Sequence, residues 1–394
     1  MMHLFINALA ASAGGGLTYI RNVVPQISRR GDVRATVLVN PALKEELGNF
    51  GNVEYVEPKR VPRGPLRYLH EQARLPGIIR RSGAHVLLSA GNVALRRSPI
   101  PQILLSRNSL YTSTDFYRDL AARGDYRIWI DTRLKAAAAK RSIYWADCTV
   151  APSRAFAREL ERWTRCPVRH ISHGFDRESF FGGGEPAAPG VQQMLHNGGD
   201  ALKLLFVSHY NYYRNFETLL RAIPIIRQQL APRPLKLFLT CRLSFGENPG
   251  SYRPEAAAAL IDRLDIRECV VELGAIPYAQ LHHVYRACHL YVTPAYAETF
   301  AHPLIEAMAC GLPVIASDLP VHREICQEAS LYFPPFSEQA LAESVVRIAN
   351  NRELAAQFSQ SALSRADKFS WERHTAEILA LAEDLISREN LSAA

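Results

Sequence analysis

The stretch YVTPAYAETFAHPLIEAMACGLPVIASDLP, residues 291–320, decides the fold predicted for this chain. It opens with β-branched residues that predict a short buried strand, which ends at Pro294. Pro303 suits the first turn of a helix and Gly311 suits the position after its last residue, so we expect a helix over 303–310. The apolar run LPVIASDLP predicts the next strand. Strand, loop, helix and strand in this order form a βαβ unit of a parallel sheet.

The loop of this unit carries Glu298, which we expect in the crevice at the carboxyl end of a strand, where open α/β sheets bind ligands. Glu306 follows near the start of the helix. The backbone N–H groups from Phe300 to Leu304 should face the same crevice, and a helix N-terminus favours phosphate. A nucleotide sugar needs carboxylates that bind its hydroxyl groups and N–H donors that bind its phosphates, and this loop would provide both.

The pattern E-x7-E followed by AMACGLPV resembles the signature of the retaining glycosyltransferases of family 4, which have the GT-B fold. The resemblance implies that Glu298 contacts the transferred sugar and Glu306 holds the ribose. It also implies donor contacts along the rest of the loop and the helix start, at Thr299, Phe300, Ala301, His302, Pro303 and Leu304. Ala301 replaces the family's usual Gly, so we expect its methyl group to crowd the donor. The simpler alternative is an acidic surface loop followed by a Glu that the helix dipole favours.

A second loop of the same domain, in the segment KLLFVSHYNYYRNFETLL, holds two further candidates. The family has an Arg and then a Lys here, and the pair holds the diphosphate. His209 stands at the first position and Arg214 at the second. A neutral His carries less charge than Arg, so Arg214 is the stronger candidate, and an ordinary surface role stays open for His209. The resemblance also places Arg242 and Gly274 beside the nucleotide base.

The first half of the chain supplies the candidates for the acceptor side. Gly15 and Gly16 lie in a Gly-rich turn between a predicted strand and a helix, which permits close approach to a phosphate or a sugar. Tyr19 stands where the dinucleotide fingerprint needs Gly, so a dehydrogenase is disfavoured. Arg107 and Asn108 follow another predicted strand, and His173 lies in a turn that resembles a family motif. Arg107 is as well explained by pairing with a nearby carboxylate.

Length and composition indicate an ordinary globular protein with two domains. We expect an acceptor domain over 1–180, a linker over 181–200, a nucleotide-sugar domain over 201–370 and a final helix over 371–394 that packs on the first domain. No run of 18 apolar residues appears, and no Lys or Arg precedes the first apolar run as in a secretory signal. The seven Cys are scattered without C-x-x-C, which suits reduced thiols in a cytosol and predicts no metal site.

The net charge of +8 is unevenly distributed. Residues 1–180 hold 28 Lys and Arg against 15 Asp and Glu, whereas residues 181–394 hold 18 against 23. A basic half suits phosphorylated substrates or an anionic membrane, and no nucleic-acid motif accompanies it. The Arg-rich segment 58–83 has Leu66, Leu69, Leu75, Ile78 and Ile79 between its charges, which predicts a weakly amphipathic helix interrupted by Pro62, Pro65 and Pro76. A solvated basic surface is an equally good explanation.

These observations predict two Rossmann-like α/β domains that face a cleft, as in the GT-B fold. We expect a retaining, metal-independent glycosyltransferase that moves a hexosyl group from a nucleoside diphosphate sugar to a glycan or lipid-linked acceptor, in surface polysaccharide, lipopolysaccharide or glycolipid synthesis. The donor is a substrate, and no cofactor is predicted. The expected location is the cytoplasm, with peripheral attachment to the cell membrane. The alternatives are a nucleotide-sugar epimerase or hydrolase, which releases nucleotide without an acceptor, and an inactive binding subunit, which His209 and Ala301 favour.

Overall fold

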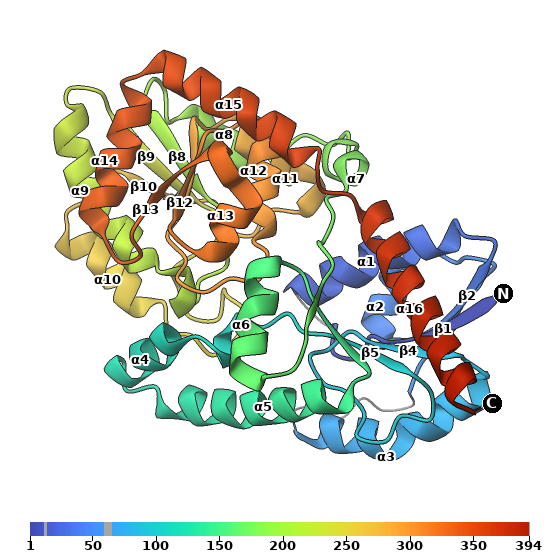
Figure 1. Ribbon diagram of the computed structural model, residues 1–394. Coiled ribbons are helices and arrows are strands. Elements are labelled where there is room, and N and C mark those ends of the chain that lie inside the picture. Colours follow the sequence, from blue (N-terminus) through green and yellow to red (C-terminus); the bar gives the residue numbers. More distant parts are fainter. Residues whose placement is uncertain (12–13, 59–64, 394) are drawn as a thin grey trace. The chain divides into compact units, whose positions relative to one another are not determined.

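The computed structural model describes residues 1–11, 14–58 and 65–393, and the chain divides into two compact units. The first unit comprises residues 1–112, 130–174 and 370–394, and the second comprises residues 113–129 and 175–369. Each unit is a parallel sheet with helices (Figure 1). This is the predicted fold class.

The first unit contains, within the described residues, a seven-stranded parallel sheet in the order β3-β2-β1-β4-β5-β6-β7. Its strands are β1 (Met2–Asn7), β2 (Val33–Leu38), β3 (Val53–Val56), β4 (Val86–Ser89), β5 (Gln102–Leu105), β6 (Cys148–Ala151) and β7 (Arg169–His170). The helices that begin in this unit or continue into it are α1 (Gly14–Ser28), α2 (Pro41–Glu46), α3 (Pro65–Ser82), the 3-10 turn η1 (Ser109–Tyr111), α5 (Tyr126–Trp145), α6 (Arg154–Thr164) and α16 (Trp371–Ala393).

Helices cover both faces of this sheet. Alternate residues of the buried strand β1 point to opposite faces, so apolar side chains on each face are packed against helices. Leu4 and Ile6 pack in one core with residues of α1 and α16, whereas Phe5 packs in a second core with residues of α3. Figure 1 shows α16 (red) beside α1 (blue). The final helix therefore packs on the first unit, as predicted.

The second unit contains, among the residues described, a six-stranded parallel sheet in the order β10-β9-β8-β11-β12-β13. Its strands are β8 (Leu202–Phe206), β9 (Leu235–Leu239), β10 (Val270–Glu272), β11 (Leu290–Thr293), β12 (Val314–Ser317) and β13 (Ser330–Phe333). Its helices are α4 (Thr114–Ala122), α7 (Arg177–Phe181), α8 (Pro189–His196), the 3-10 turn η2 (Tyr212–Arg214), α9 (Phe216–Leu230), α10 (Glu255–Arg263), α11 (Tyr278–Arg286), α12 (His302–Ala309), α13 (Pro320–Cys326), the 3-10 turn η3 (Gln327–Ala329), α14 (Glu338–Ala349) and α15 (Arg352–Ala366).

The predicted βαβ unit is present, since β11 and β12 pair in parallel with Tyr291 opposite Val314. Helix α12 begins one residue earlier than predicted and carries Pro303 in its first turn. Gly311 follows the helix with φ of +72°, a left-handed conformation that Gly adopts without steric cost.

The compact units differ from the predicted domain boundaries in two places. Residues 113–129 lie in the first half of the sequence but belong to the second unit. The predicted linker over 181–200 contains helix α8, whose Val191 and Leu195 are buried. Pro189 and Gly190 lie in the first turn of this short helix, and the other Gly and Pro residues of the segment flank it.

Candidate functional site

The order of strands in the second sheet defines a crevice at its centre. Strands β8, β9 and β10 extend to one side, and β11, β12 and β13 extend to the other. The loops after β8 and β11 therefore leave the carboxyl edge in opposite directions, which is where open α/β sheets bind ligands. The loop after β8 carries His209 and Arg214, and the loop after β11 carries Glu298.

Arg214 and Glu298 form an ion pair across this crevice. Arg214 Nη1 donates a hydrogen bond to Glu298 Oε1, and the two side chains are only 20% and 9% exposed. The guanidinium also lies 5.2 Å from the ring of Tyr213. Arg214 Nε is buried and has no hydrogen-bond partner within the part of the chain that the structure describes. The sequence assigned Arg214 to the diphosphate of a donor and Glu298 to its sugar, and the structure brings these two residues together.

Two further contacts tie the loops to each other. Asn215 Nδ2 donates to the carbonyl of Pro294 at 3.0 Å, and the N–H of Tyr296 donates to the carbonyl of Tyr213 at the same distance. Asn215 has φ of +56°, a left-handed conformation that Asn tolerates better than most residues. The crevice is therefore bordered by two loops that are bonded to each other.

Glu306 is buried on α12, with 6% of its surface exposed. Tyr285 donates a hydrogen bond from its hydroxyl to Glu306 Oε2 at 2.9 Å. Burial raises the pKa of Glu306 to about 7, and the Tyr285 hydrogen bond only partly offsets this effect. The carboxyl therefore changes its protonation state near neutral pH. In either state it offers an oxygen that accepts a hydrogen bond from a hydroxyl group.

The predicted row of N–H donors at the start of α12 is shorter than expected. Leu304 uses its N–H for the carbonyl of Ala301 at 3.0 Å, and Pro303 has no N–H. The N–H of Thr299 donates to Glu298 Oε2 at 3.2 Å. Phe300 is buried, with its ring 5.0 Å from that of His302. Ala301 has φ of +62°, which explains why a Gly would suit this position.

The remaining candidates of the second unit lie in the loops after β8, β9 and β10. His209 is exposed, and partial burial of its ring together with the charge of Arg214 lowers its pKa. Gly274 has φ of +79°, and a side chain there would meet Arg242 Nε at 3.4 Å. Arg242 and Gly274 are therefore neighbours.

In the first unit, the structure brings Arg107 to the Gly-rich turn. Arg107 Nη1 donates to the carbonyl of Gly15 at 2.9 Å, Nη2 donates to the carbonyl of Ala90, and the guanidinium lies 4.7 Å from the ring of Tyr19. A side chain at Gly16 would approach Arg107 Nη2 to 3.8 Å. Burial lowers the pKa of Arg107 to about 10. No carboxylate of a described residue pairs with it, so the predicted alternative of a carboxylate partner is wrong.

The other two acceptor-side candidates have structural contacts. Asn108 accepts a hydrogen bond from the N–H of Leu110 at 3.0 Å and caps η1. His173 is buried, and its ring lies 5.2 Å from that of Trp371 and 5.4 Å from that of Tyr19. These contacts hold the turn after β7 against α16 and α1.

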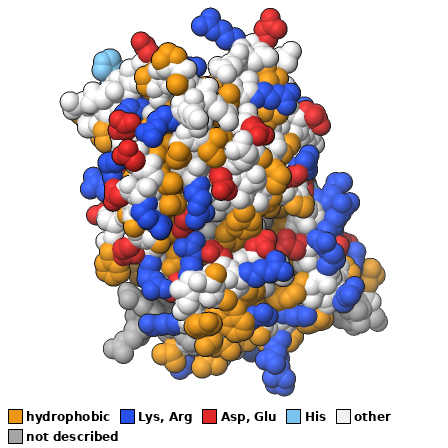
Figure 2. All heavy atoms as spheres, turned by 90° about the vertical axis from the view of Figure 1, so that its left-hand side faces the viewer, with side chains coloured by type: hydrophobic (Ala, Val, Ile, Leu, Met, Phe, Trp, Pro, Cys, Tyr) orange, Lys and Arg blue, Asp and Glu red, His pale blue; other side chains and the backbone are white. Residues whose placement is uncertain are grey.

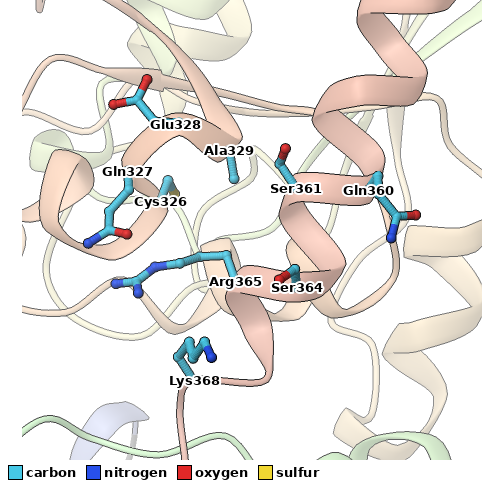
Figure 3. Close-up of a pocket in the computed structure, with 9 residues that line it drawn as sticks. All are labelled: Cys326, Gln327, Glu328, Ala329, Gln360, Ser361, Ser364, Arg365 and Lys368. Carbon is cyan, nitrogen blue, oxygen red and sulfur yellow. The ribbon is translucent and has the colours of Figure 1, made fainter.

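A separate pocket lies beside α13, η3 and α15 (Figure 3). Its volume is about 480 Å³, and it is lined by Cys326, Gln327, Glu328, Ala329, Gln360, Ser361, Ser364, Arg365 and Lys368. Arg365 donates to the carbonyls of Glu324 and Ile325 at 2.8 and 2.7 Å, so it caps the end of α13. No predicted site residue lines this pocket.

No group of three or more His, Cys, Asp or Glu side chains among the described residues is arranged to hold a metal ion. None of the helices in residues 1–11, 14–58 and 65–393 is both long and apolar enough to cross a membrane.

Two glycosyltransferase family models match this chain. The family model for glycosyl transferases group 1 matches residues 194–365, and the model for glycosyltransferase family 4 matches residues 13–179. A D-inositol 3-phosphate glycosyltransferase from Saccharomonospora viridis is 26% identical over 93% of this chain and 88% of its own length.

Two solved structures show the same fold. Sucrose-phosphate synthase from Thermosynechococcus elongatus aligns with a TM-score of 0.76 at 19% identity and covers 100% of both chains. HepE from Anabaena, solved with UDP-glucose, aligns with a TM-score of 0.71 at 18% identity, over 98% of this chain and 100% of its own.

Proposed function

We propose that this chain transfers a hexosyl group from a nucleoside diphosphate sugar to an acceptor hydroxyl, with retention and without a metal ion. The proposal starts from its family: the chain belongs to the family 4 glycosyltransferases, whose two models together match most of its length. The observation that carries this proposal is the Arg214–Glu298 ion pair at the switch point of the second sheet. It provides one cation for a diphosphate and one carboxylate for a sugar at the same place.

In the proposed reaction, the bond between sugar C1 and the diphosphate oxygen breaks and a bond from the acceptor oxygen to C1 forms. The acceptor hydroxyl passes its proton to the departing diphosphate oxygen, which develops negative charge as its bond to C1 breaks. Arg214 stabilises this charge, because a cation already fixed in a water-poor crevice needs little reorganisation during the reaction. Glu298 positions the sugar, and Glu306 accepts a hydrogen bond from the ribose. The HepE complex with UDP-glucose supports a donor of this chemical class.

The acceptor that we propose is a glycan or a lipid-linked sugar, used in surface polysaccharide or glycolipid synthesis in the cytoplasm. Its support is the positive charge of residues 1–180 and the buried guanidinium of Arg107, which no carboxylate of the described residues neutralises. A cation of this kind suits an acceptor that carries phosphate.

We also propose that the protein binds an anionic membrane surface through α5. Figure 2 shows hydrophobic side chains gathered at the lower edge of one face, among Lys and Arg side chains. Helix α5, at the bottom of Figure 1, exposes Ile130, Leu134 and Tyr144 on one face, and Arg133 and Arg141 are exposed beside them. An exposed apolar stripe with basic neighbours is typical of helices that lie on anionic lipid.

The segment 58–83, for which the sequence suggested either lipid binding or a solvated basic surface, is less suited to lipid binding. It forms the single helix α3 from Pro65 onward, so Pro76 does not break it. Leu75 and Ile79 are buried in the core beneath the sheet, which leaves only Leu66 and Leu69 exposed. Residues 59–64, with Pro62 and Arg63, lie outside the described residues.

The test begins with purified protein and UDP-, GDP-, dTDP- and ADP-sugars, without added metal. One donor should raise the thermal midpoint, and release of its nucleotide should require an acceptor. Release without an acceptor would indicate a hydrolase or an epimerase, and no response to any donor would indicate an inactive binding subunit.

Two variants then test the site itself. Glu298→Gln and Arg214→Met should each lower turnover by about 100-fold, the typical cost of removing one group that stabilises the transition state. Glu298→Gln leaves Arg214 without its carboxylate, so it should not weaken binding of the free nucleoside diphosphate. Glu255→Gln and Arg221→Met change exposed residues of the same unit and serve as controls. Wild-type turnover in both site variants would refute the assignment.

A further inference from the structure

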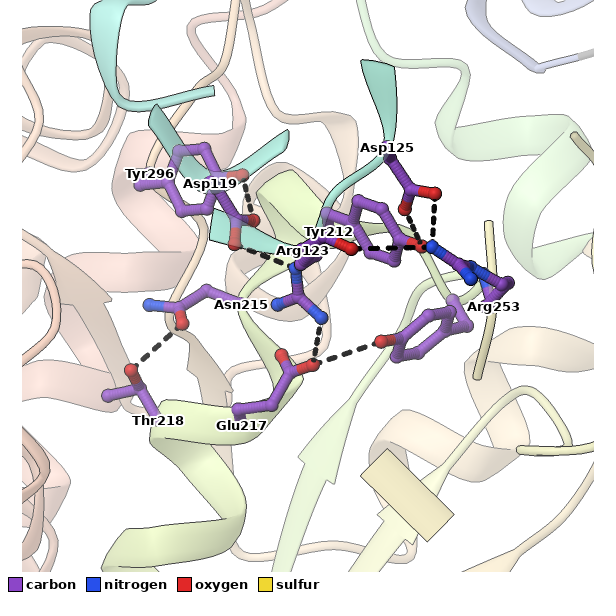
Figure 4. Close-up of polar contacts among 10 residues, drawn as sticks. Asp119, Arg123, Asp125, Tyr212, Asn215, Glu217, Thr218, Arg253 and Tyr296 are labelled. Atoms are coloured by element: carbon purple, nitrogen blue, oxygen red, sulfur yellow. Dashed lines mark hydrogen bonds and ion pairs between the residues drawn. The ribbon is translucent and has the colours of Figure 1, made fainter. Parts of the chain in front are cut away.

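Residues 113–129, which we call the inserted segment, lie in the first half of the sequence but form part of the second unit. The segment consists of α4 and the first turn of α5. Phe116 and Leu120 of α4 are fully buried, so the helix packs firmly on its unit. Its charged residues make a connected set of polar contacts with the two loops of the candidate site (Figure 4).

The first contact reaches the loop after β11. The hydroxyl of Tyr296 donates a hydrogen bond to Asp119 Oδ2 at 2.7 Å, and Arg123 Nε donates to Asp119 Oδ1 at 2.7 Å. Tyr296 is buried and precedes Glu298 by two residues. Asp119 therefore anchors the loop that carries Glu298.

The second contact reaches the loop after β8 and the helix that follows it. Arg123 Nη1 donates to Glu217 Oε1 at 3.0 Å, and the same oxygen accepts a hydrogen bond from the hydroxyl of Tyr210 at 3.0 Å. The guanidinium of Arg123 lies 4.2 Å from the ring of Tyr212. Arg123 therefore contacts the loop at Tyr212 and the first turn of α9 at Glu217.

A third contact holds the end of the same loop. The hydroxyl of Tyr212 donates to Asp125 Oδ2 at 2.6 Å, and Arg253 forms an ion pair with Asp125 (Figure 4). Tyr212 is the first residue of η2, the turn that ends at Arg214. The position of Arg214 thus depends on a side chain that the inserted segment holds.

Charge makes this set of contacts cooperative. Burial alone would lower the pKa of Arg123, but the carboxylates of Glu217 and Asp119 raise it, so the side chain is a fixed cation between two anions. Removing one member of such a partly buried set leaves its partners with uncompensated charge. We therefore expect the contacts to form and break together.

We propose that Arg123 and Asp119 are positioning residues of the donor site, which fix the loop that carries Arg214 relative to the loop that carries Glu298. This inference rests on the proposed function for its effect on turnover. Its effect on the loops is independent of that function. A misplacement of reacting groups by about 1 Å lowers rates by up to about 100-fold.

The experiment compares Arg123→Met and Asp119→Asn with Arg118→Met and Asp115→Asn in the full-length protein. Arg118 and Asp115 lie on the same helix and pair with each other at its surface, so the control variants remove the same groups without touching the loops. Hydrogen exchange of residues 206–215 and 294–301 is measured by mass spectrometry, and donor KM and kcat are measured in parallel.

Arg123→Met and Asp119→Asn should increase exchange in both loops and lower kcat at saturating donor by 10- to 100-fold, and Arg123→Lys should restore part of the loss. The controls should match the wild type. Unchanged loop exchange in a folded Arg123→Met protein, or a uniform rise across the second unit, would overturn the proposal. If either variant fails to fold, Tyr296→Phe removes one hydroxyl only and should still increase exchange in 294–301. If the wild type transfers no sugar, the proposed function fails, and the exchange measurement still decides this inference.

Discussion

Glu306 gives the protein a dependence of stability on pH that one substitution should remove. Its pKa is about 7 in the folded protein against an ordinary value of 4.5. The folded state therefore holds the proton more tightly than the unfolded state. The contribution of Glu306 to stability is largest at low pH, falls as the pH rises from about 4.5 to about 7, and is constant above. The difference between these two pKa values corresponds to about 3 kcal/mol.

Glu306→Gln keeps the shape of the side chain and an oxygen for the Tyr285 hydroxyl, but it never ionises. The variant should therefore be more stable than the wild type at pH 8 by about 3 kcal/mol, and the difference should shrink by about 2 kcal/mol at pH 5. Urea unfolding of the ligand-free protein at several pH values measures both quantities. The same variant should bind the donor more weakly, because Gln is a poorer acceptor for ribose hydroxyls than a carboxylate.

The control is Glu383→Gln, which removes an exposed carboxylate on α16. Its stability should follow that of the wild type at every pH. If Glu306→Gln also follows the wild type from pH 5 to pH 8, the buried carboxyl is not responsible and the argument fails.

Three other variants have expected outcomes. Ala301→Gly should stabilise the protein by about 0.5–1 kcal/mol in thermal unfolding. It relieves about 1–2 kcal/mol of strain from the left-handed backbone at residue 301, which outweighs the added conformational freedom of the unfolded chain. A loss of stability would contradict this reasoning. Gly311→Ala should have the opposite sign and cost about 1–2 kcal/mol, since it places a side chain at φ of +72° and 3.3 Å from Ser359 Oγ. The double variant Ile130→Ser and Leu134→Ser should reduce sedimentation with vesicles that contain phosphatidylglycerol, whereas Phe245→Ser, at another exposed hydrophobic residue, should not. Equal sedimentation of both variants would exclude α5 as the lipid-binding surface.

The sequence predicted the parts of the site that depend on local pattern. The βαβ unit around Glu298 was predictable because Pro303, Gly311 and two apolar runs each specify their own conformation. The place of Glu298 and Arg214 at the carboxyl edge then follows from the geometry of parallel sheets. The roles assigned to the individual site residues stay predictions.

The contacts between distant residues were not predictable in the same way. Asp119 and Arg123 are four residues apart on a helix, a spacing that is usual for exposed ion pairs, and nothing local shows that Tyr296 and Glu217 lie beside them. The ion pair of Arg214 with Glu298 likewise joins residues 84 positions apart. The aromatic run of Tyr210, Tyr212 and Tyr213 in a polar loop was the one signal that pointed to a buried surface.

The inserted segment also decides how this enzyme can be divided or recombined. A fragment that starts at residue 175 and ends at residue 369 omits α4, so the surface that receives Phe116 and Leu120 would face water and Glu217 would lose its guanidinium. Such a fragment should aggregate unless a peptide of residues 113–129 is supplied with it. For the same reason, a chimera that exchanges donor specificity between two relatives has to carry residues 113–129 together with 175–369. A single crossover point in the sequence would separate pieces that fold as one.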